Sequence, residues 1–162
     1  MASNTAGSIA ELTGVHAYWV LGIVFMVLAV IAAYPLFFRV YLAAFRGEAD
    51  IAGPAAATTW IPLGVVGQST SAIALLFGTR VEIVVGSALL VLAIPMVLFA
   101  MWHFYPAVLK WVDYSPAWWA STFPTGAIGV GGYSLASAWD LDWLSTIAAV
   151  LPALLILHWS LW

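Results

Sequence analysis

The chain consists of long apolar stretches that are separated by short clusters of polar and charged residues. A helix of about 20 apolar residues is long enough to cross the hydrocarbon core of a bilayer. We therefore predict one transmembrane domain over residues 15–162, after a short, exposed polar tail at residues 1–14. The expected membrane-spanning helices cover residues of about 16–38, 59–78, 83–108, 117–138 and 143–162.

The apolar stretches predict helices rather than barrel strands. Inside a bilayer each backbone N–H and C=O group must find a partner in the protein, so only helices and closed barrels can span it. The stretches are too long and too continuous for the alternating strands of a barrel. Composition agrees, because 65% of the residues are hydrophobic and 7% are charged, against roughly 25% charged in soluble domains. The expected fold class is an all-α integral membrane bundle with five transmembrane helices.

The predicted spans are of two kinds. The second and fourth contain glycines, hydroxyl side chains and an amide, whereas the third and fifth are mostly aliphatic, with Pro95 and Pro152 near their centres. We interpret this alternation as two hairpins, each with an inner and an outer helix, preceded by one unpaired outer helix. Duplicated units of this kind are common in transport proteins.

Each inner helix carries a stripe of small and polar residues. At about 100° per residue, a helix brings positions three and four apart onto one face. The stripes contain Gly64, Gly67, Gln68 and Ser71 in the second span, and Thr122, Gly126, Gly129 and Tyr133 in the fourth. Two interpretations remain open: close packing of helices through small residues, or the wall of a pore, which the amide and the hydroxyls favour.

A pore with this lining favours anions. No carboxylate is expected within any span, and a buried charge would have marked a proton relay or an ion-coupling site. A neutral wall of backbone dipoles, amides and hydroxyls suits an anion better than a cation. Phe123 is a large aromatic residue in a segment of small residues, and we interpret it as an apolar plug.

Basic residues in the connections predict the orientation. If the spans alternate, Arg39, Arg46 and Lys110 lie on one side of the membrane and Arg80 lies on the other. The positive-inside rule then places the C-terminus in the cytoplasm and the N-terminus outside the cell membrane. An outside N-terminus without a positively charged signal sequence suggests that a segment upstream of Met1 is missing.

Other chemistry finds little support. Cysteine is absent, and no phosphate loop or metal-ligand spacing occurs. Four serines of the spans have no histidine or carboxylate nearby in sequence: Ser69, Ser71, Ser121 and Ser134. We therefore expect no enzyme, no metal, no cofactor and no binding of nucleic acid. One alternative of lower rank is a b-type haem protein, in which His103 and His158 at similar depth would ligate one haem.

Two motifs resemble a known family. The segment from Trp118 to Gly126 is similar to the "WW-x-x-TFP-x-G" signature of the tellurite-resistance/dicarboxylate transporter family, which includes plant slow-type anion channels, the yeast malate permease and sulfite efflux pumps. The segment from Pro62 to Gln68 resembles the "P-x-G-P-x-GQ" stretch of the malate and sulfite branch, with Val65 where that branch usually has proline.

The resemblance implies a function and an assembly. Members of the family have ten helices in five hairpins, whose inner helices line a central pore, and they commonly form trimers. The five spans here would correspond to the last five helices, and the occluding phenylalanine of the family carries over to Phe123. We therefore expect transport of a small anion, either sulfite or a C4-dicarboxylate such as malate, through a neutral pore gated by Phe123.

Two pore-lining helices out of five cannot close a conduit. The expected partners are thus the lipid bilayer, the small anion, and either further copies of the chain or a partner chain that supplies the missing half. The alternatives are a non-conducting membrane assembly subunit and a truncated remnant.

Overall fold

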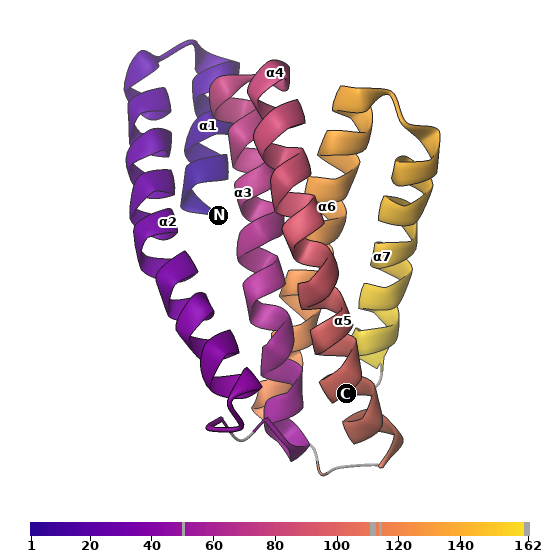
Figure 1. Cartoon of the computed structure of the whole chain (residues 1–162). Helices are drawn as coiled ribbons and strands as arrows, with labels where there is room; N and C mark the ends of the chain where they lie inside the picture. Colours follow the sequence, from indigo (N-terminus) through magenta and orange to yellow (C-terminus); the bar gives the residue numbers. More distant parts are fainter. Residues whose placement is uncertain (50, 111–112, 114, 161–162) are drawn as a thin grey trace.

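The computed structural model describes residues 1–49, 51–110, 113 and 115–160, apart from the side chains of Pro54 and His158. The described residues contain no strand, so the expected all-α fold class is confirmed (Figure 1). The helices in chain order are α1 (Ala2–Thr13), α2 (His16–Phe45), the 3₁₀ helix η1 (Gly53–Trp60), α3 (Ile61–Phe77), α4 (Thr79–Val81), the π-helical turn η2 (Glu82–Gly86), α5 (Ser87–Leu109), the 3₁₀ helix η3 (Pro116–Ser121), α6 (Thr122–Trp139) and α7 (Asp142–Ser160).

Three helical stretches in the described part of the chain are long and apolar enough to cross a membrane. They are His16–Phe45, Ala55–Phe77 and Thr79–Leu109, and they correspond to the first three predicted spans. Helices α6 and α7 occupy the positions of the fourth and fifth predicted spans, but α7 counts only as a shorter apolar helix. A total of five spans therefore stays a prediction.

The N-terminal segment differs from the expected exposed tail. It forms helix α1, which packs against α2 and α3 and buries Ser3, Ala6 and Gly7. These small residues lie three and four apart, on one helix face, so α1 can approach its neighbours closely. The prediction was wrong because it looked for a long apolar run, whereas α1 is a short helix of small and polar residues. Consequently α2 is not unpaired, since α1 and α2 form a hairpin (Figure 1).

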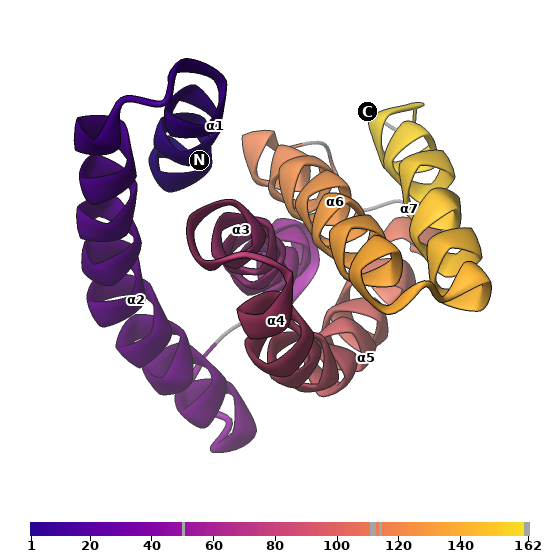
Figure 2. The same cartoon turned by 90° about the horizontal axis from the view of Figure 1, so that it is seen from above.

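Helices α3 and α6 form the centre of the molecule. Seen from above, they lie between α2 and α7 (Figure 2). In the most apolar 18-residue window of the stretch that contains α3, 61% of the residues are buried, against 6% for α2 and 17% for the stretch that contains α5. The expected difference between buried, glycine-rich helices and exposed, aliphatic helices is therefore present.

The centre depends on direct contact between backbones. A Cβ atom on Gly67 of α3 would lie 2.2 Å from the backbone oxygen of Ala127 in α6, and one on Gly131 would lie 2.7 Å from the backbone oxygen of Gly67. Only glycine fits at these positions, because the obstructing atoms belong to the backbone and cannot rotate away. Small residues allow helices to approach in this way in membranes.

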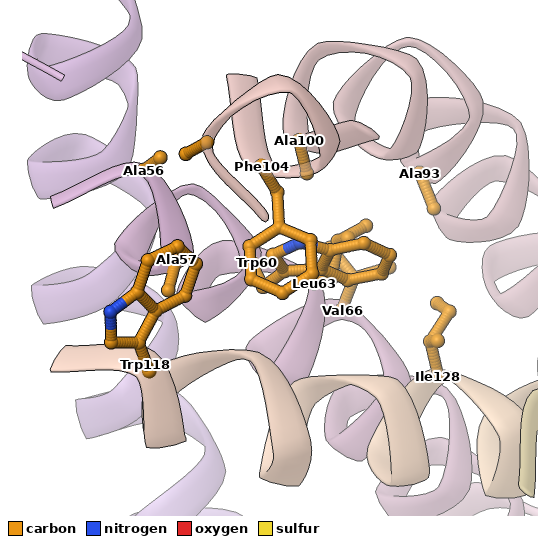
Figure 3. Close-up of a cluster of buried hydrophobic side chains, with 11 residues drawn as sticks. Ala56, Ala57, Trp60, Leu63, Val66, Ala93, Ala100, Phe104, Trp118 and Ile128 are labelled. Atoms are coloured by element: carbon orange, nitrogen blue, oxygen red, sulfur yellow. The ribbon is translucent and has the colours of Figure 1, made fainter. Parts of the chain in front are cut away.

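A cluster of aromatic rings at the start of α3 and α6 is the second contact that holds these helices together (Figure 3). Phe104 of α5 contacts Trp60 at a ring-centroid distance of 5.9 Å and Trp118 at 5.5 Å, both in edge-on geometry. All three side chains are fully buried. The cluster joins η1 and η3, which lead directly into α3 and α6, and so it fixes the relative positions of the two helices at this end. Trp119, in contrast, is 42% exposed.

Replacement of Gly67 by alanine is expected to destabilise the protein strongly. The added methyl group would overlap the backbone of α6, and overpacking of this kind costs about 1–3 kcal/mol or more. Thermal unfolding in detergent, followed by size-exclusion chromatography, measures the loss. Gly132→Ala is the matched control, because a Cβ there meets the side chain of Ala148 at an ordinary 3.6 Å. Equal melting temperatures for the two variants would contradict the proposed backbone contact.

Candidate functional site

Phe123 lies in the first turn of α6, with its ring against α3. A Cβ atom on Gly64 would lie 3.0 Å from Cε1 of the Phe123 ring, so the absence of a side chain at Gly64 creates the space that the ring occupies. The other side of the ring is open, and the residue is 46% exposed. The two motifs that resemble a known family therefore meet at this contact.

An open cavity of about 560 Å³ lies next to the Phe123 ring. Four of the predicted site residues line it, and they come from both inner helices: Gln68, Thr122, Phe123 and Gly126. The remaining lining residues are mainly apolar and include a contribution from α7: Ala127, Val130, Leu155, Ile156 and Trp159. Sequence reasoning had assigned the last predicted span to an outer helix, and so it missed this contribution.

The other five predicted site residues lie outside the cavity lining, and one of them is Gly64, which is covered by the Phe123 ring. Tyr133 is 60% exposed and lies further along α6. Gly67 is buried against α6, and a Cβ on Gly129 would lie 3.2 Å from Cβ of Leu151 in α7. Ser71 is buried and donates a hydrogen bond of 3.2 Å to the carbonyl of Gly67 in its own helix. We assign these three buried residues to helix packing, so both interpretations of the stripes apply, each to different residues.

The described lining of the cavity carries no charged side chain. Its polar groups are the Gln68 amide, the Thr122 hydroxyl and the Trp159 indole. The Thr122 hydroxyl donates a hydrogen bond of 2.8 Å to the carbonyl of Trp119. Its single proton is thus in use, whereas the amide of Gln68 has two donors.

Gln68 has a partner that sequence reasoning missed. Nδ2 of Asn4, in α1, donates a hydrogen bond of 2.8 Å to Oε1 of Gln68. One residue further along α3, the hydroxyl of Tyr34 donates to Ser69 at 3.2 Å. Asn4 was overlooked because its segment was expected to be an exposed tail. The signal was available, since Asn4 stands beside the small residues that form the buried face of α1.

A second overlooked residue is Glu82. It was expected in a turn outside the spans, but it lies within the continuous helical stretch Thr79–Leu109 and is only 4% exposed. Its carboxylate oxygen Oε1 accepts a hydrogen bond of 2.5 Å from the hydroxyl of Ser134 in α6. The turn that was expected at Glu82 is therefore helical in the structure. The π-helical turn at Glu82 explains the difference, because the chain enters α5 without leaving helical geometry.

Replacement of Ser134 by alanine is expected to lower the free energy of unfolding. It leaves a buried carboxylate oxygen without this donor, and hydrogen bonds to charged groups contribute about 1.5–3 kcal/mol. Chemical or thermal unfolding in detergent measures the change. Ser137→Ala serves as the control, because that exposed hydroxyl bonds to the carbonyl of Tyr133 in its own helix. A melting temperature for Ser134→Ala as high as that of the control would show that the bond contributes nothing.

The described part of the chain gives no support to the haem alternative, in which two histidines would ligate one haem. The ring of His103 packs against Phe99 at a centroid distance of 4.6 Å. The side chain of His158 lies outside the described residues, so the pairing of the two rings stays an untested prediction. Among the described residues no group of three or more potential metal ligands comes together.

Apolar helices around a central glycine-rich pair, with a neutral cavity beside them, are features of a multi-pass membrane protein of the transport class. All 162 residues match the SLAC1 family of voltage-dependent anion channels, and the chain belongs to this family. The family consists of channels and transporters rather than enzymes, and its members are oligomeric membrane proteins. No curated protein and no solved structure shows a significant match.

Proposed function

We propose that the chain forms one wall of a transmembrane pore for small anions, with Phe123 as the gate. The observation that carries the proposal is the position of the Phe123 ring, which lies on Gly64 and at the edge of a cavity that both inner helices line. Membership of an anion channel family supports the same function. The gate would belong to α6, and the lining would come from α3, α6 and α7.

The chemistry of the cavity supports an anion over a cation. Its described lining contains no carboxylate, and an amide and an indole supply N–H donors. Fixed dipoles of this kind replace part of the water around an anion. We extend the proposal to sulfite and to C4-dicarboxylates such as malate, on the resemblance of the segment from Pro62 to Gln68 to that branch.

The proposed pore needs further chains. On α6, Phe123, Val130 and Tyr133 are 46%, 58% and 60% exposed, which leaves an apolar stripe beside the cavity without cover from the described residues. We propose that further copies, as in a trimer, or a partner chain that supplies the other pore helices, cover this stripe. The pore would lie in the cell membrane, with the C-terminus of the chain on the cytoplasmic side.

Replacement of Phe123 by alanine is expected to increase anion conductance several-fold, because an apolar constriction closes a pore by excluding water. The measurement is anion flux in proteoliposomes that contain the purified assembly, with malate, sulfite, nitrate and chloride as the tested anions. Currents equal to those of the unmodified protein would reject Phe123 as the gate while leaving the fold unchanged.

Val130→Ala is the matched control for this experiment. Val130 is an apolar residue of similar exposure in the lining of the same cavity, but it lies about two helical turns further along α6 than Phe123. It should change the flux far less than Phe123→Ala does. A purified complex with a second chain that conducts no anion in any variant would instead favour the non-conducting assembly subunit.

A further inference from the structure

We infer that Gln68 is an anion-binding residue of the cavity and that Asn4 is the residue that positions its amide. The inference rests on the proposed pore for the identity of the ligand. Its own basis is the pair formed by Asn4 and Gln68 across α1 and α3, together with the place of Gln68 in the cavity lining. The ligand class is a small anion that accepts hydrogen bonds, such as a carboxylate, sulfite or nitrate.

The hydrogen bond from Asn4 determines which end of the Gln68 amide is available. A primary amide has one carbonyl oxygen, which accepts, and one NH₂ group, which donates twice. Because Nδ2 of Asn4 donates to Oε1 of Gln68 at 2.8 Å, the oxygen is turned toward α1. No group among the described residues accepts a hydrogen bond from the Gln68 amide, so its two N–H donors are available for a ligand in the cavity.

The surroundings make these donors effective. Thr122, the other polar side chain of the cavity on the inner helices, already uses its proton in the bond to the carbonyl of Trp119. Most of the remaining described lining is apolar, and a hydrogen bond is electrostatically stronger in such a medium than in water. A carboxylate in the lining would repel an anion, but the described lining contains none.

Gln68 also lies at a useful place along the proposed pathway. It follows Gly64 by four residues, so the two lie on one face of α3, about one helical turn apart. The Phe123 ring covers Gly64. An anion that passes the ring therefore meets the amide of Gln68 one turn further on.

The local structure of Asn4 supports a positioning role. Its Oδ1 atom is buried and has no hydrogen-bond partner among the described residues. A buried polar atom without a partner reduces stability, and such exceptions to good packing are typical of functional sites. Asn4 thus places its amide where the hydrogen bond to Gln68 requires it, at the expense of its own oxygen.

The test uses the full chain in its purified assembly and has two measurements. One is the concentration of malate or nitrate at half-maximal flux in proteoliposomes, and the other is the affinity for the same anions in detergent, from isothermal titration. Gln68→Leu, which keeps the size but removes the donors, should weaken both by about 10- to 100-fold, as expected for loss of a hydrogen bond to a charged group. Gln68→Glu should weaken them further, through repulsion.

Asn4→Asp should weaken anion binding even though Gln68 is unchanged. An aspartate accepts hydrogen bonds but does not donate them when ionised, so Gln68 would turn its NH₂ group toward α1 and its oxygen toward the cavity. Asn4→Gln, which retains a donor, should recover part of the affinity. In the Gln68→Leu background, Asn4→Leu, which removes the donor without adding a charge, should have no further effect, because a residue that acts only through another shows full coupling in a double-mutant cycle.

Thr5→Ala on α1 and Ser69→Ala on α3 are the controls, since neither residue lines the cavity. If the protein transports anions but Gln68→Leu and Asn4→Asp match the controls, the inference is wrong and the proposed pore stands. If anions bind, and binding falls in these variants, yet no flux occurs, the inference stands and the pore proposal is wrong. Absence of both binding and flux would overturn both.

Discussion

The contact between the backbones of α3 and α6 at Gly67 and Gly131 determines most of what surrounds it. With both residues lacking a side chain, the two helices approach so closely that their backbones touch. This distance brings the Phe123 ring onto Gly64 and places Gln68 in the same cavity as Thr122. In a bilayer, where lipid competes for apolar contacts, close packing of this kind is a main source of helix association.

Most hydroxyl side chains in this arrangement donate a hydrogen bond to a carbonyl of their own helix and seldom connect two helices. Thr70, Ser71 and Thr125 each donate to a carbonyl four residues earlier in the chain. Such bonds let polar residues lie in a buried interface without needing a partner across it. Side-chain bonds between helices are fewer. Examples are those from Asn4 to Gln68, from Ser3 to the carbonyl of Gly22 and from Ser134 to Glu82.

The sequence is sufficient for the helical class and for the burial of the two glycine-rich helices. It is insufficient where the outcome depends on a partner in space. Gly67 and Gly126 look alike on a helical wheel, yet Gly67 is pressed against a backbone and Gly126 borders the cavity. Hydropathy likewise does not show whether a charged residue lies in a loop or, like Glu82, in a π-helical turn that continues into the next helix. The short helix α1 was missed because its burial comes from small residues rather than from apolar length.

The aromatic cluster of Trp60, Phe104 and Trp118 has a mechanical consequence for the proposed gate. It clamps the starts of α3 and α6 at one end, while the bond between Ser134 and Glu82 connects α6 to the chain that follows α3 further along. Because contacts at two positions along their length hold α3 and α6, tilting of one helix against the other is resisted. The low-energy movement left to Phe123 is rotation of its own side chain, an event of the picosecond to nanosecond range in exposed residues. Opening would then be a change of rotamer within a static frame, fast compared with any rearrangement of the bundle.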